Sequence, residues 1–231
     1  MRLATLAVLA SALVAAADTR LERGDAPGIA ADYVPPAAGS YRLPVIQRVG
    51  NHPLIDAGDR PTSLFDLKGR RLAVVAFIYT ACTDAGGCPF SQATLLSLDR
   101  ALGADTELGR EAMLITVSFD PGRDTPQRLS QTRDLYRPRS DWHFVTTPGD
   151  SLQAMLDDFG QPVAKLRLED GSWSGLYRHV LKVFLLDRDD GVRNIYSTGF
   201  LDRDLVLNDL RTLARQTPRA ENGVATSGSG P

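Results

Sequence analysis

The sequence has few of the residues that bind soft metals or form disulfide bonds. Its 231 residues include two cysteines and three histidines. A zinc site of four cysteines is therefore excluded, and one of two cysteines and two histidines would need a second well-placed histidine. All thiol chemistry in the chain depends on the single pair Cys82 and Cys88.

The chain also lacks an excess of charge of either sign, since its formal net charge is -2. Arginines often stand beside acids, as in Asp187-Arg188-Asp189, so the surface is predicted to be mixed and no nucleic-acid partner is indicated. Hydrophobic residues make up 43%, which is typical of a soluble globular domain. Without its two ends, the chain suits one domain of about 180 residues.

Both ends differ from the middle in composition. Residues 1–17 are predicted to be a signal peptide, with Arg2, a short apolar run and three closing alanines. The apolar run is short for a membrane span of about 20 residues, so an uncleaved anchor is the lesser alternative. We expect a periplasmic or otherwise exported protein, soluble after cleavage. Residues 18–40 indicate a linker or extended arm, and 216–231 a disordered tail.

Between these ends, apolar runs alternate with amphipathic segments. The predicted strands span 72–79, 113–119, 142–146, 180–186 and 192–196, and the predicted helices span 89–102, 125–136, 151–159 and 201–214. Ahead of them, 45–49 and 53–55 are predicted to form a hairpin around Gly50-Asn51. This order is typical of an α/β thioredoxin-like fold with an N-terminal hairpin extension.

Cys82 and Cys88 lie between the first long strand and the helix that begins at Pro89. Three interpretations are open. A structural disulfide would close so short a loop that it contributes only about 2 kcal/mol. A thiol–disulfide exchange site would use Cys88 as the thiolate favoured by the helix N-terminus. A metal site would take Cu(I), or Zn²⁺ with further ligands.

His179 is the histidine best placed to join the cysteines. It precedes the strand 180–186, whose start can approach the cysteine loop in a thioredoxin-like layout. Two thiolates and one imidazole suit Cu(I), and Cu(II) with a weak further ligand. His52 and His143 are predicted to be a turn residue and a packed strand residue outside the site.

Three segments in order resemble the Sco/SenC family of copper-binding, thioredoxin-like proteins linked to cytochrome c oxidase assembly. They are Phe77 to Cys82 with Cys88-Pro89, Val117 to Pro126, and Leu176 to His179 with Val183 to Asp187. The resemblance covers residues 64–213 and assigns 41–215 to one domain. It implies that Cys82, Cys88 and His179 hold one copper ion, and that the cysteines cycle between dithiol and disulfide. The family usually has three residues between its cysteines, whereas this chain has five.

Two acidic residues near the cysteines, Asp120 and Asp84, have two interpretations each. Asp120, at the end of its strand, is predicted to tune the metal by hydrogen bonding to one of its ligands, or else to form a turn. Arg123 and Asp124 are expected to form a turn, a helix cap and a local ion pair. Asp84, inside the cysteine loop, is expected to be a solvated loop residue, and the alternative is that its charge favours a bound cation.

The sequence therefore predicts an exported copper-binding protein with a redox-active pair, Cys82 and Cys88. It would deliver copper to, or maintain the thiol redox state of, a partner copper site such as that of cytochrome c oxidase. The expected partner is a copper-receiving exported or membrane-bound protein. A metal-independent periplasmic thiol-disulfide oxidoreductase is the alternative. A peroxidase is a third, less favoured interpretation, because Thr80 is near but the loop holds no arginine.

Overall fold

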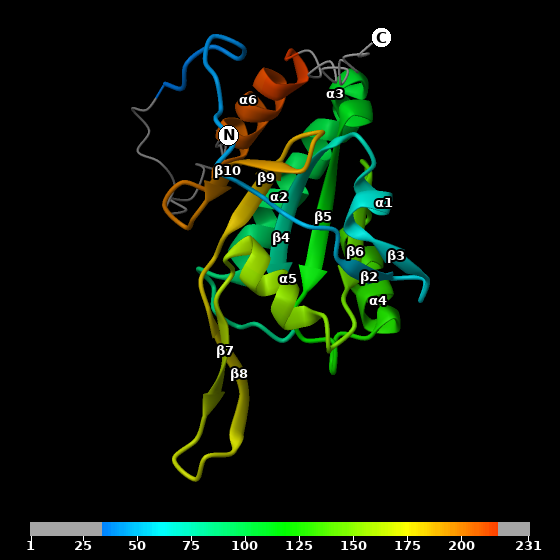
Figure 1. Cartoon of the computed structure of the whole chain (residues 1–231), viewed down its shortest axis with the longest axis vertical. Coiled ribbons are helices and arrows are strands. Elements are labelled where there is room, and N and C mark those ends of the chain that lie inside the picture. The colour runs from blue at the N-terminus through cyan, green and yellow to red at the C-terminus, as the bar shows by residue number, and fades with distance from the viewer. Residues whose placement is uncertain (1–33, 217–231) are drawn as a thin grey trace, which may run out of the picture.

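A computed structural model describes residues 34–216 of the chain. Its main element is an eight-stranded sheet in the order β1-β10-β9-β4-β5-β6-β2-β3, and a separate two-stranded sheet pairs β7 with β8 (Figure 1). The strands are β1 Gln47–Arg48, β2 Pro53–Asp56, β3 Pro61–Ser63, β4 Leu72–Ile78, β5 Ala112–Ser118, β6 Trp142–Thr146, β7 Val163–Arg167, β8 Trp173–His179, β9 Val183–Leu186 and β10 Gly191–Tyr196. The helices are α1 Leu64–Lys68, α2 Cys88–Ala104, α3 Thr106–Glu111, α4 Pro126–Tyr136, α5 Leu152–Phe159 and α6 Arg203–Ala214.

The centre of the sheet consists of β4 and β5, in which every residue is buried. These strands run parallel to each other, and β9 pairs antiparallel with β4. Side chains of α2, α4 and α6 pack on one face, and those of α1 and α5 on the other. Because helices cover both faces, the central strands are continuous apolar runs rather than alternating ones. The predicted strands 72–79 and 113–119 are thereby confirmed.

The predicted N-terminal hairpin has a different pairing. β1 pairs with β10 and β2 pairs with β6, so the two strands lie on opposite sides of the sheet centre. The residues between them do not close a turn, because Gly50 N–H donates to Asp158 and the Asn51 side chain accepts from Phe65 N–H. The N-terminal hairpin of the fold is instead β2 with β3.

The hairpin of β7 and β8 is the main element that the sequence analysis did not predict. It projects from the lower end of the molecule in Figure 1. Its turn contains Asp170-Gly171, and Gly171 has a φ of 81°, the left-handed conformation that glycine adopts readily. His179 is the last residue of β8, so the next strand begins at Val183 and not at residue 180 as predicted.

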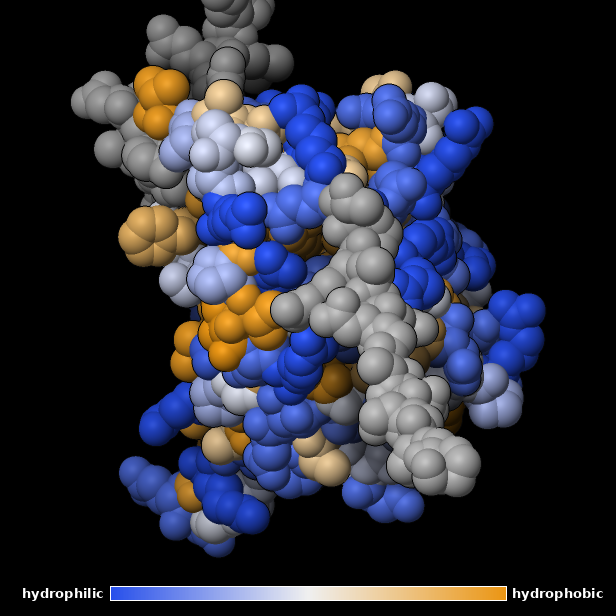
Figure 2. All heavy atoms as spheres, turned by 45° about the horizontal axis from the view of Figure 1, so that its top comes forward, coloured by the Kyte–Doolittle hydropathy of each residue, from blue (hydrophilic) through white to orange (hydrophobic). Residues whose placement is uncertain are grey.

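Hydrophilic residues predominate on the face seen in Figure 2, where hydrophobic residues of the described chain form small groups. No helix within residues 34–216 has both the length and the apolar character needed to cross a membrane. The predicted signal peptide, most of the predicted linker and nearly all of the predicted tail lie outside the described residues.

Candidate metal centre

The end of β4 is anchored before the cysteine loop begins. Asp124, buried after β5, accepts hydrogen bonds from Thr80 N–H at 2.9 Å and from Ser118 Oγ at 2.6 Å, and the Thr80 hydroxyl also donates to it. Asp124 was expected to act in a turn, a cap and a local ion pair, whereas it joins the cysteine loop to the neighbouring strand. Since the Thr80 hydroxyl is bound to Asp124, the peroxidase interpretation gains nothing from this threonine.

The loop returns its second cysteine to the first position of a helix. Gly87 is the N-cap of α2, and its N–H donates to Asp84 O at 2.9 Å. Cys88 is therefore the first residue of α2 and is 4% exposed, while Cys82 is only partly buried. The two thiols differ in access: a partner molecule can approach Cys82 more readily than Cys88.

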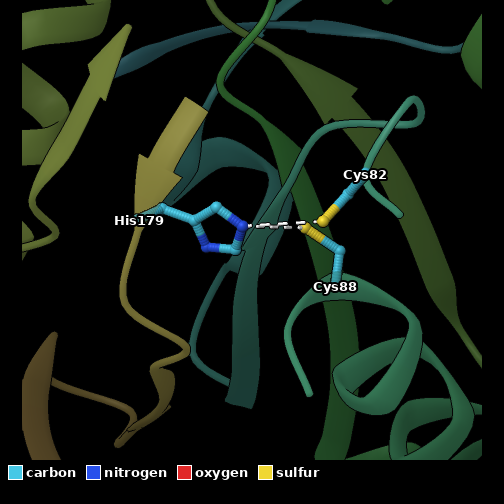
Figure 3. Close-up of side chains that lie close together, drawn as sticks. All are labelled: Cys82, Cys88 and His179. Atoms are coloured by element: carbon cyan, nitrogen blue, oxygen red, sulfur yellow. Dashed lines mark hydrogen bonds between the residues drawn. The ribbon is translucent and has the colours of Figure 1, made fainter. Parts of the chain in front are cut away.

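The three predicted ligands converge (Figure 3). His179 Nε2 lies 3.6 Å from Cys82 Sγ and 3.6 Å from Cys88 Sγ. All three ligand atoms lie within 4.8 Å of one another, and they form the one such group of cysteine, histidine or acidic residues within the described chain. The five-residue loop thus brings both sulfurs to one point opposite the imidazole.

Burial decides the protonation of the site. It raises the pKa of the Cys88 thiol well above its usual range, which corrects the expectation that the helix N-terminus makes Cys88 the favoured thiolate. Burial also lowers the pKa of His179, although the charge of Asp84 opposes this. Without a metal, the site at neutral pH therefore holds a Cys88 thiol and a neutral imidazole that is free to bind a metal.

The donor set favours a soft ion. Two sulfurs and one imidazole nitrogen are suited to Cu(I), which accepts three ligands of this kind. A structural zinc site would need a fourth ligand, and within the described residues no further histidine, cysteine or carboxylate belongs to the group. The residues present therefore fit copper better than zinc.

The other candidate residues lie outside the ligand group. His52 bonds to Asp158 at 2.7 Å, and His143 bonds to Asp141 at 2.6 Å. Asp120 makes no hydrogen bond to a ligand: its carboxylate accepts from the Tyr177 hydroxyl at 3.0 Å and pairs with Arg123. The local ion pair expected for Arg123 at this turn is formed with Asp120 and not with Asp124.

Aromatic side chains around His179 were not predicted as part of the site. The His179 ring lies 5.8 Å from the ring of Tyr79 and 5.4 Å from that of Phe119. Tyr177, two residues before His179, contacts both of these rings at 5.1 Å and 5.4 Å. The alternation Trp173, Gly175, Tyr177, His179 is the sequence signal that could have identified this face of β8.

Solved structures with the same fold include two proteins of the Sco family. The structure of ScoI from Arabidopsis thaliana with copper bound has a TM-score of 0.61 and 20% identity, over 73% of this chain and 99% of that one. BsSco, described as a member of the Sco family of cytochrome c oxidase assembly proteins with a disulfide switch, has a TM-score of 0.59 and 20% identity, over 77% and 100%. The predicted thioredoxin-like α/β fold is confirmed.

Sequence comparison gives the family. A protein of Stutzerimonas stutzeri, described as copper-binding, is 31% identical over 134 residues, which are 57% of this chain and 61% of that protein. This chain thus matches less than two thirds of that relative's length. The family model SCO1/SenC matches residues 46–215. The spacing of Cys82 and Cys88 is consistent with that family, so the expectation that it departs from the family is not upheld. The chain belongs to the SCO1/SenC family.

Proposed function

We propose that this protein binds one copper ion through Cys82, Cys88 and His179. The observation that carries the proposal is the convergence of two sulfurs and one imidazole nitrogen, each sulfur 3.6 Å from Nε2. Two thiolates with Cu(I) leave one net negative charge, which the N-terminal end of α2 at Cys88 stabilises. Copper is then cargo, held by soft ligands and released to a site that binds it more tightly.

We further propose that the protein delivers copper to, or keeps reduced, a copper site on an exported or membrane-bound partner, such as a subunit of cytochrome c oxidase. Family membership supports this role, as does the description of BsSco among oxidase assembly proteins. The partial exposure of Cys82 supports it as well, because an incoming ligand can reach the ion beside that sulfur. The predicted signal peptide of residues 1–17 would place the protein outside the cytoplasm.

Metal analysis tests the proposal directly. Reduced protein mixed with excess Cu(I) and desalted is expected to retain one copper per chain, because the described residues supply one soft ligand group. The same protein with both thiols alkylated is the matched control and should retain none. Retention of no copper by the reduced protein, or equal retention after alkylation, would contradict the proposed site.

Copper affinity is expected to rise with pH. Binding must displace the proton of Cys88, whose pKa burial raises, whereas His179 is already neutral because burial lowers its pKa. Each displaced proton makes the affinity rise about tenfold per pH unit. Competition with a Cu(I) chelator between about pH 7 and pH 8, corrected for the chelator's own protonation, measures this slope. A copper affinity that does not change with pH would contradict this prediction, because it would mean that Cys88 is already a thiolate before copper binds.

Thiol–disulfide exchange is the second candidate, and the proximity of the two sulfurs, within 4.8 Å of each other, supports it. Cys82, the more accessible sulfur, would attack a partner disulfide as a thiolate and form a mixed disulfide. That attack releases the first partner sulfur as a thiolate, and Cys88 then attacks Cys82 Sγ, closes the Cys82–Cys88 bond and releases the second. The partner disulfide is thereby reduced by two electrons, and the two protons of the cysteines pass to the partner's thiols. A His179→Ala variant that keeps full disulfide reductase activity, with no requirement for copper, would favour this candidate.

A further inference from the structure

His179 lies on one face of a strand that leaves the body of the domain. Ring contacts place Trp173, Tyr177 and His179 on one side of β8: the Trp173 and Tyr177 rings lie 5.3 Å apart, and the Tyr177 and His179 rings each lie 5.4 Å from Phe119. In the described chain β8 pairs with β7 alone, and the two strands project as a ribbon in Figure 1. Strand pairing within the main sheet therefore does not fix the position of His179, so other contacts must hold this face against the cysteine loop.

Arg123, from the turn after β5, provides the first of these contacts. Its guanidinium carbon lies 4.6 Å from the ring centre of Trp173 and 5.8 Å from those of Tyr177 and Tyr79. Between the two rings of β8 stands Gly175, and a Cβ there would come within 3.8 Å of Arg123 Nη1. A Cβ at that distance would make only an ordinary contact, so the faces of the aromatic rings, and not a space at the glycine, hold the planar cation on the strand.

A hydrogen bond provides the second contact on the same face. The Tyr177 hydroxyl donates to Asp120 Oδ1 at 3.0 Å, and Arg123 donates to the other oxygen of that carboxylate. Asp120 is 4% exposed, so both bonds are shielded from water. Burial, together with Asp120, raises the pKa of Tyr177 to about 12, so the hydroxyl remains a donor at physiological pH.

We infer that Arg123 is a positioning residue for the metal ligand His179. By holding Trp173 and Tyr177 against the turn after β5, it keeps the imidazole opposite the two sulfurs. It therefore sets how tightly copper is held and how quickly it is released to a partner. This inference rests on the proposed copper site and names the side chain that controls the stability of that site.

The test compares two cations that lie over the same ring. Arg123→Gln is expected to weaken Cu(I) binding about tenfold and to speed copper release by a similar factor, as for other residues that orient a metal ligand. Lys165 Nζ also lies over the Trp173 ring, at 4.8 Å, but it belongs to β7 and cannot join the ribbon to the body. Lys165→Gln is therefore the matched control and should change affinity less than twofold.

The apo protein offers a readout that does not depend on copper. The His179 ring lies beside Tyr79 and Phe119, so its proton resonances carry ring-current shifts in NMR spectra. These shifts should shrink in Arg123→Gln and remain in Lys165→Gln. Tyr177→Phe, which keeps the ring and loses the bond to Asp120, is a second variant that should shrink them by a smaller amount.

Two outcomes separate the inference from the proposed function. If His179→Ala weakens copper binding but Arg123→Gln and Tyr177→Phe leave affinity, release rate and His179 shifts unchanged, the positioning role is wrong and the copper site stands. If the wild-type protein retains no copper, the proposed function fails, and the His179 shifts of the apo variants still decide whether Arg123 positions the imidazole. An Arg123→Gln variant that is less stable to heat but has normal affinity and shifts would also overturn the inference.

Discussion

Replacing His179 by alanine is expected to weaken copper binding more than about a hundredfold, beyond the usual effect of residues that only support a ligand. The reason is geometric. Nε2 is the single donor other than sulfur in the ligand group and lies 3.6 Å from each Sγ. Without it, two sulfurs remain, one of which is a buried thiol that must still lose its proton. Chelator competition measures the loss for Cu(I).

His143→Ala is the matched control for this prediction. His143 is a half-exposed residue of β6 whose imidazole bonds to Asp141 at 2.6 Å. Asp141 also pairs with Arg71, so it keeps a partner when the imidazole is removed. The copper affinity of His143→Ala should be within about threefold of the wild-type affinity, since His143 touches none of the three ligands. In the Cu(II) form, His179→Ala should lose nitrogen hyperfine coupling and keep sulfur charge-transfer bands. Equal affinities of the two variants would contradict a three-ligand site.

The ligands can be predicted from the sequence because each is tied to a local pattern. Cys82 and Cys88 stand between a continuous apolar run and a proline that can begin a helix. His179 stands in a third segment that resembles the family. The structure has the elements that these patterns predict beside the cysteines: β4 precedes Cys82 and α2 begins at Cys88. The histidine is the last residue of β8.

The remaining features depend on packing between distant segments, which no local pattern contains. The pKa of Cys88 depends on the side chains that pack over the start of α2. Their burial of the thiol raises this pKa by more than the helix N-terminus lowers it. The β7–β8 ribbon has no buried residue on either face, and Gly175 interrupts the aromatic alternation of β8, so its sequence shows a weaker pattern than the hydrophobic alternation that predicts strands. Asp124 was expected to remain in a local turn, yet it holds Thr80, which is 44 positions earlier.

Lys68 is the clearest case of a role that the sequence does not reveal. It ends α1 and is fully buried, although lysine is almost never buried without partners. Its ammonium group donates to the backbone carbonyls of Gly69, Arg71, Asp187 and Arg188 at 3.0–3.3 Å. Asp190 Oδ1 lies 2.8 Å away as an ion-pair partner. The lysine therefore joins α1 to the turn between β9 and β10.

Lys68→Met is expected to lower the free energy of unfolding by about 3 kcal/mol. Methionine fills a similar volume but leaves four carbonyl groups and one carboxylate without their shared donor. Urea unfolding followed by circular dichroism measures the change. Copper stoichiometry should stay the same in the folded variant, because Lys68 contacts none of the three ligands.

Two control variants separate burial from charge. Lys182 is half-buried and donates one solvent-exposed hydrogen bond, to the carbonyl of Gly160, so Lys182→Met should change stability by no more than about 0.5 kcal/mol. Asp190→Asn removes the ion pair but keeps the four carbonyl bonds, and should cost about 1 kcal/mol. If Asp190→Asn costs as much as Lys68→Met, the ion pair, and not the cage of four carbonyl groups around the ammonium, stabilises the contact between α1 and the β9–β10 turn. If Lys68→Met costs no more than Lys182→Met, the cage does not contribute to the fold.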